Sequence, residues 1–228
     1  MQYSTFAAID IGSYDVILEI FEISKKQGIR SVDKICHRME LGKDTYTLGK
    51  IRPEMEEELC RVLADFVRIM EGYRVDDYRA TASSAISEAS NSLYVLGKIH
   101  QLTGLSVTVL SNSEQRFLSY KALAAMEDNF NKIIEKGTAI LDLDGGSFQI
   151  SLFDKDALVT TQNIRMGSLR IRERLAGIQS ETEHYEEMVE ELIWNEVSSF
   201  KKMYLKDRKI ENIMPVSYTH LRAHETSQ

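Results

Sequence analysis

The sequence predicts an α/β protein made of two related halves, each of which opens with a β-hairpin. Apolar strands alternate with amphipathic helices along most of the chain, which is typical of this fold class. The pattern that begins at Asp10 also recurs 132 residues later at Asp142. Each copy has an apolar strand, an Asp, a turn of small residues, a second strand, and a Phe eleven residues after the Asp. A repeat of this length exceeds any solenoid period and indicates a duplicated unit.

The first half is predicted to begin with a hairpin over residues 5–23, because Val16, Leu18 and Ile20 alternate with polar side chains after the turn. A helix is predicted to begin at Pro53, since Pro suits the first helical turn and the acids that follow suit the helix dipole. Later patterns predict a strand at 78–82, a helix that ends at Gly104, a strand at 105–110 and a helix at 111–126.

The boundary between the halves is expected at residues 128–137, because a new apolar strand at 138–143 follows them. A long helix is predicted over 181–205, with acidic residues at its start and lysines at its end. We therefore expect a first half at 1–127, the start of a second half at 128–214, and a separate tail at 215–228.

The tail is expected to be foreign to the protein. The eleven residues from Val216 to Thr226 match one translated reading frame of a common transposon-based sequencing adapter. We therefore exclude the tail from the fold prediction, as any non-native extension would be. On this interpretation the natural C-terminal part is missing, the second half is incomplete, and a metal pair at His220 and His224 is a false lead.

Composition excludes several classes of protein. The 228 residues carry a formal net charge of −7, with 43% hydrophobic and 28% charged residues, unlike a disordered or membrane-spanning chain. The acidic balance argues against a general nucleic-acid binder, so an anionic ligand must be held locally. Cys36 and Cys60 have no zinc spacing and no disulfide framework. Without a signal peptide, a cytoplasmic location is expected.

The two hairpin turns have the chemistry of phosphate-binding loops. In each, an Asp at the end of a strand is followed by Gly and Ser, whose exposed N–H groups can surround phosphate oxygens. Asp10 and Asp142 are placed where they can hold hydrated Mg²⁺, which takes one or two carboxylates and keeps several waters. One such turn alone is more typical of an ordinary hairpin, whereas two copies in register favour a phosphate site.

Five segments carry a family resemblance, namely Asp10-Ile-Gly-Ser13, the run from Ala82 to Asn91, Ser111-Asn-Ser-Glu-Gln-Arg116, Asp142-Leu-Asp-Gly-Gly-Ser147 and Met166-Gly-Ser-Leu-Arg170. In this order they resemble motifs of the exopolyphosphatase/guanosine pentaphosphate phosphohydrolase (Ppx/GppA) family, within the actin, Hsp70 and sugar-kinase superfamily. The resemblance covers residues 3–214. A later glycine-rich motif of that family is expected beyond residue 214.

The resemblance implies a ribonuclease-H-like, actin/Hsp70-type fold in two α/β halves. It implies Mg²⁺-dependent removal of terminal phosphates from polyphosphate or guanosine pentaphosphate, with no nucleic-acid or membrane partner, and a homodimer as a family expectation. The expected metal ligands are Asp10, Asp142 and Asp144. The expected phosphate-binding residues are Gly12, Ser13, Ser83, Ser84, Gly145, Gly146, Ser147 and Arg170.

Four positions depart from the family pattern, and all four are positions that the resemblance assigns to the active site. Gln115 replaces the family's general base, and Gln149 replaces a Glu linked to metal or water. Asp144 replaces the first Gly of the second loop, and Ser87 replaces a phosphate-facing Arg. Loss of a general base costs about 10²- to 10⁴-fold in rate.

Three compensations stay open. In the first, Glu114 acts as the base. In the second, Asp144 binds the metal or the water, and in the third, Gln115 orients the water as a glutamine does in small GTPases. Glu114 would need a shifted register to replace its neighbour, because adjacent helical residues point about 100° apart. It also completes a capping box with Ser111, which is a purely structural role. The candidate catalytic residues are therefore Glu114, Gln115 and Gln149.

Three functions fit these observations. The first is a Mg²⁺-dependent phosphohydrolase that acts on polyphosphate or guanosine pentaphosphate. The second is a binding or sensing protein that keeps the phosphate cradle and has lost turnover. The third is a phosphotransferase or ATPase, because hairpins of this superfamily also bind ATP.

Overall fold

The computed structural model describes residues 3–126, 129–176, 184–205 and 208–217. The chain forms two compact units, residues 1–115 and 116–228, and each is built on its own mixed β-sheet. The predicted α/β class is therefore confirmed. Within the described residues, no helix is long and apolar enough to cross a membrane.

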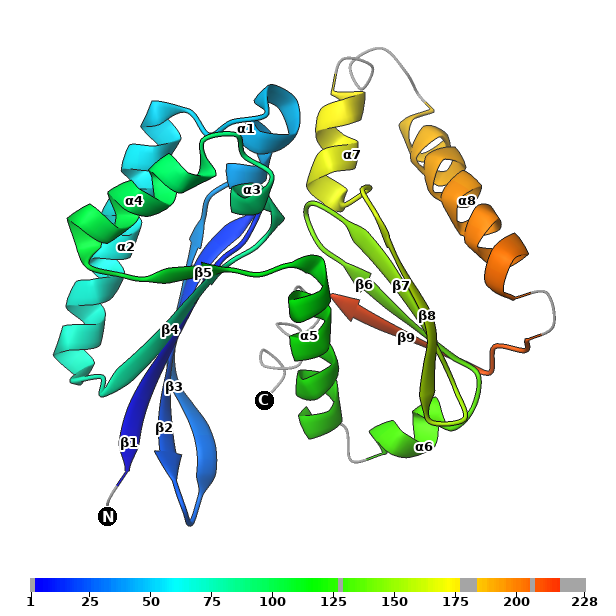
Figure 1. Ribbon diagram of the computed structural model, residues 1–228, viewed down its shortest axis with the longest axis horizontal. Coiled ribbons are helices and arrows are strands. Elements are labelled where there is room, and N and C mark those ends of the chain that lie inside the picture. Colours follow the sequence, from blue (N-terminus) through cyan, green and yellow to red (C-terminus); the bar gives the residue numbers. More distant parts are fainter. Residues whose placement is uncertain (1–2, 127–128, 177–183, 206–207, 218–228) are drawn as a thin grey trace. The chain divides into compact units, whose positions relative to one another are not determined.

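The first unit contains a five-stranded sheet in the order β3-β2-β1-β4-β5 (Figure 1). Its first three strands form an antiparallel meander, and β4 pairs with β1 in parallel. The strands are β1 (Ser4–Ile11), β2 (Asp15–Ser24), β3 (Gly28–Arg38), β4 (Asp77–Ala82) and β5 (Val107–Val109). The helices are α1 (Leu41–Leu48), α2 (Pro53–Tyr73), α3 (Ser84–Ser87) and α4 (Ser92–Thr103).

The core of the first unit is one cluster that joins the sheet to α2 and α4. Helix α2 begins at Pro53, as predicted, and α4 ends before Gly104, which adopts the left-handed conformation of a helix C-cap. The buried stripe of α2 has the helical spacing that the sequence predicts and includes Leu59, Val62, Leu63, Phe66 and Met70. This core fixes the end of β1, where the first candidate loop begins.

The second unit contains a four-stranded sheet in the order β8-β7-β6-β9 (Figure 1). The hairpin β6–β7 is antiparallel, and β9 pairs with β6 in parallel. The strands are β6 (Thr138–Leu143), β7 (Phe148–Asp154), β8 (Ala157–Ile164) and β9 (Asn212–Ser217). The helices are α5 (Asn112–Met126), which begins just before the division between the units, α6 (Phe130–Ile134), α7 (Ser168–Leu175) and α8 (Tyr185–Tyr204).

The two hairpins share one register at a constant offset of 132 residues. Asp10 pairs with Ile17 across β1 and β2, and Asp142 pairs with Gln149 across β6 and β7. In both units the first strand of the hairpin also pairs in parallel with a later strand, which is β4 in one and β9 in the other. The duplication predicted from the sequence is therefore confirmed at the level of strand pairing.

The duplication extends to the turns and to the irregularities of the sheets. The N–H of Gly12 donates to the carbonyl of Asp15 at 2.9 Å, and the N–H of Asp144 donates to the carbonyl of Ser147 at 3.0 Å. Each sheet also has a register shift at equivalent positions, which are Ile20/Phe21 and Leu152/Phe153. The same backbone frame therefore carries two different sets of side chains.

The division between the units lies at Gln115/Arg116 and not at the expected 127/128. Helix α5 belongs mostly to the second unit, because Tyr120 and Leu123 pack against that unit's core. The expected linker at 128–137 contains α6, whose Phe130 and Ile134 are buried in the same core. A boundary was expected there because a strand follows. In the structure, the side chains of this segment already pack in the core of the second unit.

The expected foreign tail falls partly on a strand. Residues 215–217 complete β9 and pair with the end of β6. Residues 218–228 lie outside the described residues. The foreign origin of the tail stays a prediction.

Candidate phosphate-binding site

Loop 1, residues 12–14, joins β1 to β2 directly after Asp10 and Ile11. The amide of Gly12 is engaged within the turn by its hydrogen bond to Asp15. A Cβ atom at Gly12 would lie 3.0 Å from the carbonyl oxygen of Asp15, so the tight turn favours glycine there. Ser13 is buried at 1% exposure, and its carbonyl accepts a hydrogen bond from the N–H of Gly42 at 3.0 Å. Helix α1 therefore holds loop 1 in place.

Three hydroxyl groups meet beside loop 1. The Oγ of Ser13 lies 2.7 Å from the Oη of Tyr46, and that Oη lies 2.8 Å from the Oγ of Ser84. The two serine oxygens are 3.4 Å apart. Ser83, the residue before Ser84, is buried, and its Oγ has no hydrogen-bond partner among the described residues. The structure therefore brings Ser13 and Ser84 together and leaves a buried hydroxyl next to them in the chain.

The end of the Ala82–Asn91 segment makes structural hydrogen bonds within the first unit. Asn91 donates to the carbonyl of Ile51 and to the carboxylate of Glu56, both at 2.8 Å, and accepts from the N–H of Ile51 at 3.0 Å. Glu56 is buried at 4% exposure and also pairs with Lys98 at 3.4 Å. Ser87, at the family's Arg position, is exposed.

Loop 2, residues 144–147, joins β6 to β7 and is braced by the start of α7. The carbonyls of Asp144 and Gly145 accept hydrogen bonds from main-chain N–H groups of residues 168–170 at 3.0 to 3.1 Å. The Nε of Arg170 donates to the carbonyl of Gly146 at 3.0 Å, so this predicted phosphate-binding residue also supports the loop. The N–H of Gly145 donates to its neighbour Asp144 at 2.6 Å. Among the described residues, the main-chain hydrogen bonds that brace loop 2 use the N–H groups of Asp144 and of residues 168–170, and not those of Gly146 and Ser147.

Asp142 is a carboxyl group in an unusual environment at the end of β6. Burial, followed by the nearby charge of Asp144, raises the pKa of Asp142 to about 6, and a hydrogen bond from Ser119 partly opposes this shift. The Oγ of Ser119 lies 3.5 Å from the Asp142 carboxylate. The second unit therefore holds two neighbouring carboxylates, one of them largely removed from water.

A polar row crosses the second sheet at Asp142. Gln149 lies opposite Asp142 on β7, and Asn163 lies opposite Gln149 on β8. Gln149 is buried at 7% exposure, and the amide of Asn163 donates to the Oγ of Ser147 at 3.3 Å. In the first unit, the equivalent neighbours of Asp10 are Ile17 and Cys36. The polar chemistry is therefore concentrated in the second hairpin.

The two carboxylates of the second unit fit a hard divalent cation. Among the described residues, no group of three or more His, Cys, Asp and Glu side chains could hold a metal. Mg²⁺ needs only one or two carboxylates, however, because it keeps most of its water ligands. A divalent cation would also stabilise the ionised form of Asp142, whose pKa is raised first by burial and then by the charge of Asp144.

Glu114 is committed to capping α5. Its carboxylate accepts hydrogen bonds from the N–H of Ser111 at 2.9 Å and from the Oγ of Ser111 at 2.7 Å. The N–H of Glu114 in turn donates to the Oγ of Ser111 at 3.3 Å, which completes the capping box. These hydrogen bonds lower the pKa of Glu114, which makes it a weaker base.

Gln115 occupies a different side of α5. It precedes Ser119 by four residues, so the two side chains share one face, roughly 40° apart around the helix axis. Glu114 points roughly 140° away from Ser119 on the same helix. The side of α5 that carries the Asp142 contact therefore presents the neutral amide of Gln115 and not the carboxylate of Glu114.

Gly167 is expected to be essential for the shape of loop 2. A Cβ atom at this position would overlap the carbonyl oxygen of Asp144 and the main-chain carbon of Gly145, neither of which can rotate away. We expect Gly167→Ala to lower the free energy of unfolding by about 2 to 4 kcal/mol, measured by urea denaturation. Gly97→Ala, in the middle of α4 with open space around it, is the matched control and is expected to be neutral or stabilising. An equal effect of the two substitutions would contradict the proposed close approach.

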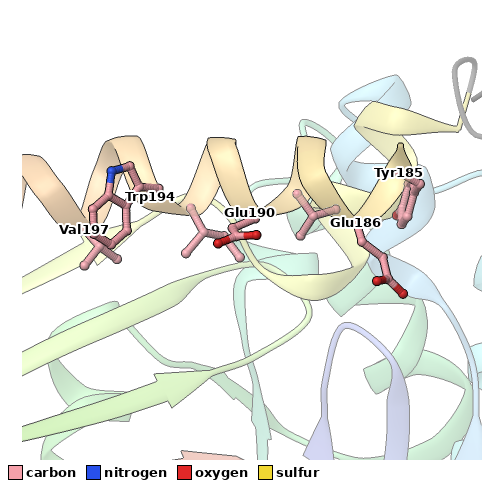
Figure 2. A pocket seen from close by; sticks show the side chains of 7 residues that line it. Tyr185, Glu186, Glu190, Trp194 and Val197 are labelled. Carbon is pink, nitrogen blue, oxygen red and sulfur yellow. The ribbon is translucent and has the colours of Figure 1, made fainter. Parts of the chain in front are cut away.

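A hollow along α8 has the wrong chemistry for phosphate. Figure 2 shows Tyr185, Trp194 and Val197 along it, together with the carboxylates of Glu186 and Glu190. Two acids on an apolar helix face repel an anion, and no Arg or Lys among the described residues lines the hollow. Among the described side chains of α8, Phe200 is buried.

Three residues near the loops were missed from the sequence. Tyr46 meets Ser13 and Ser84, Ser119 meets Asp142, and Asn163 meets Ser147. Each contact joins elements far apart in the chain, so no short motif reveals it. The spacing of Ser119, one helical turn after Gln115, is the one signal that was available in advance.

The chain has two α/β units that open with the same hairpin, each with an Asp before a turn that contains Gly and Ser, which agrees with the expected actin/Hsp70-type fold. The model of the Ppx/GppA phosphatase family matches residues 19–227. The chain therefore belongs to the Ppx/GppA phosphatase family, which confirms the resemblance. The match includes most of the residues expected to be a foreign tail.

Curated relatives are distant and longer. The chain is 22% identical over 174 residues to a bifunctional 3-dehydroquinate synthase/phosphatase of Fusobacterium nucleatum, which covers 74% of this chain and 26% of the relative. It is 25% identical over 144 residues to exopolyphosphatase 1 of Mycobacterium leprae, which covers 63% of this chain and 41% of the relative. The chain thus spans less than half the length of these relatives.

Solved structures confirm the fold. The Ppx/GppA family member of Aquifex aeolicus matches with a TM-score of 0.69 at 22% identity, over 94% of this chain and 66% of that one. An exopolyphosphatase from Cytophaga hutchinsonii matches with a TM-score of 0.73 at 18% identity, over 99% of this chain and 72% of that one. At these identities the similarity shows the fold alone.

Proposed function

We propose that the protein is a Mg²⁺-dependent phosphohydrolase that removes terminal phosphate from a phosphoanhydride, either polyphosphate or guanosine pentaphosphate. The observation that carries this proposal is the second hairpin, where the carboxylates of Asp142 and Asp144 adjoin a loop whose bracing main-chain hydrogen bonds do not use the amides of Gly146 and Ser147. Carboxylates beside donor amides suit a ligand that combines phosphate oxygens with a divalent cation. Exopolyphosphatase relatives support the substrate class.

Each part of the site has a distinct role in this proposal. The amides of Gly146 and Ser147 bind phosphate oxygens, and Arg170 holds the loop through the Gly146 carbonyl. Asp142 and Asp144 hold Mg²⁺ in the second unit, and Asp10 is the candidate ligand of the first. The bound ion would neutralise phosphate charge. Gln115 or Gln149 orients the attacking water by hydrogen bonding. Neither amide can act as the general base, because a neutral amide does not accept the proton of the water.

A second candidate function is phosphate binding without turnover. The observation that favours it is the use of Glu114 in the capping box. With Glu114 engaged there, its carboxylate does not take over the role of general base that Gln115 cannot perform. Such a protein would bind the same anion and act as a sensor. A phosphotransferase or ATPase would instead move phosphate from a nucleotide to an acceptor.

The test is phosphate release from polyphosphate and from guanosine pentaphosphate, each with and without Mg²⁺. We expect slow, Mg²⁺-dependent release that Asp142→Ala abolishes. Saturable binding with no release, in both the unmodified protein and the variant Gln115→Glu, would favour the sensor. Neither binding nor release would contradict both functions.

A further inference from the structure

We infer that α8 is a self-association surface, on which a second copy of this chain docks in antiparallel orientation around Trp194. The inference goes beyond the proposed function and does not depend on it. The evidence lies within the second unit, in the exposure of Trp194 and in the distribution of charge along α8. The family resemblance implies a homodimer without indicating a surface, whereas these observations indicate one.

Trp194 is a large apolar side chain on the outside of the second unit. It is 64% exposed and lies beside Val197 at one end of the hollow along α8 (Figure 2). The packed face of the helix is a different one, because Phe200 is buried in the core of the unit and points roughly 120° away from Trp194. Aromatic side chains are enriched in protein interfaces. Trp194 therefore marks a face of α8 that suits a partner.

The charges of α8 are divided between its two ends. Acidic residues occupy the first half and lysines the last turn, namely Glu186, Glu187, Glu190 and Glu191 against Lys201 and Lys202. A parallel pair of such helices would place like charges together, which is unfavourable. An antiparallel pair instead places the acidic half of each copy against the basic end of the other. The charge pattern therefore suits a second copy of the same helix in antiparallel orientation.

Glu187 and Lys201 are placed symmetrically about Trp194. Each is seven residues away, or about two helical turns, so both side chains point within roughly 20° of the Trp194 direction. Both residues are exposed, and the contact of Glu187 with His184 at 2.9 Å stays within one turn of the helix. A two-fold axis at Trp194 therefore brings Glu187 of each copy opposite Lys201 of the other, with the two indole rings between these pairs.

The dimer is expected to be weak, because one pair of helices buries less surface than the roughly 800 Å² per partner of a standard interface. We expect a monomer–dimer equilibrium with its midpoint at a protein concentration on the order of 100 μM, measured by sedimentation equilibrium. Trp194→Ala should weaken the dimer about 30-fold, as the loss of a central aromatic side chain does. Leu93→Ala is the matched control, because Leu93 is 84% exposed on α4 of the first unit, and it should leave the dimer unchanged.

Charge reversal tests the antiparallel arrangement. Glu187→Lys alone and Lys201→Glu alone should each weaken the dimer about tenfold, because two attractive pairs become two repulsive ones. An equimolar mixture of the two variants should restore the affinity of the unmodified protein, since every pair in the mixed dimer then joins opposite charges. Glu57→Lys, at an exposed position of α2, makes the same change in net charge as Glu187→Lys and should leave the dimer unchanged.

Three results would overturn the inference. They are a mixture that associates no better than the single variants, a dimer that Trp194→Ala leaves intact, and an unmodified protein that stays monomeric at its highest soluble concentration. Circular dichroism shows whether each variant is folded, and the mixing experiment decides the matter even if Trp194→Ala is not. Phosphate binding is measured separately with tripolyphosphate, so failure of the dimer and failure of the proposed function are distinguishable.

Discussion

Gln115→Glu is expected to raise the rate of phosphate release roughly 100- to 10,000-fold, which is the usual contribution of a general base. The substitution places a carboxylate on the face of α5 that carries Ser119, one helical turn away. Ser119 contacts Asp142, so this face looks toward the acidic end of the second hairpin. The unmodified amide can orient water but cannot take its proton. Release from polyphosphate with Mg²⁺ at saturating substrate measures the effect.

Two control variants make the result specific. Gln101→Glu adds the same charge at an exposed position of α4 and should leave the rate unchanged. Glu114→Gln removes the capping carboxylate and should weaken the start of α5 without lowering the rate. If Glu114→Gln instead abolished release and Gln115→Glu did not raise it, Glu114 would be the working base and our assignment would be wrong.

Asp142→Asn is expected to stabilise the metal-free second unit by about 2 to 3 kcal/mol at about pH 8. The pKa of Asp142 is about 6 in the folded protein and lies near its ordinary value of 3.8 in the unfolded chain. The folded state therefore binds the proton more tightly. Stability from this group falls as the pH rises from about 4 to about 6, and the full penalty of the buried charge is present above that range. Asparagine removes the charge and can still accept the hydrogen bond from Ser119.

Urea denaturation followed by the fluorescence of Trp194, the single tryptophan, measures this effect within the second unit. At about pH 4 the gain should vanish, because the unmodified carboxyl group is then protonated in the folded state. Asp156→Asn, at an exposed turn of the same unit, should change stability little at either pH. A gain that is the same at both pH values would contradict the pKa assignment. The same variant should lose any Mg²⁺-dependent binding, so stability and function are expected to change in opposite directions.

Much of the fold could be predicted because the sequence repeats itself. The equal spacing from Asp10 to Phe21 and from Asp142 to Phe153 indicates one hairpin used twice, and the strand registers are indeed equivalent. Pro53 and Gly104 mark helix ends through backbone constraints that act locally. The unit to which α5 belongs depends on which core Tyr120 and Leu123 enter, and packing across distant segments leaves no local signal.

The candidate site was predictable in its loops and not in their surroundings. Asp142, Gly146 and Ser147 follow from a turn whose backbone chemistry is visible in the sequence. The raised pKa of Asp142 depends on burial, which only the packing of the sheet defines. Tyr46 is 33 residues from Ser13 and enters the site only because α1 docks against loop 1. A side chain that supports a loop from another element lies at no fixed distance from it in the sequence, so no spacing pattern predicts the contact.

The central claim is that loop 2 of the second hairpin binds a phosphoanhydride, and titration calorimetry of the unmodified protein with tripolyphosphate tests it most directly. Inorganic sulfate at the same concentration serves as the control for nonspecific anion binding. We predict a saturable heat with one ligand per chain that strengthens with Mg²⁺ and disappears in Asp142→Ala. A titration without saturable heat, or one that sulfate and Asp142→Ala reproduce equally, would contradict the claim.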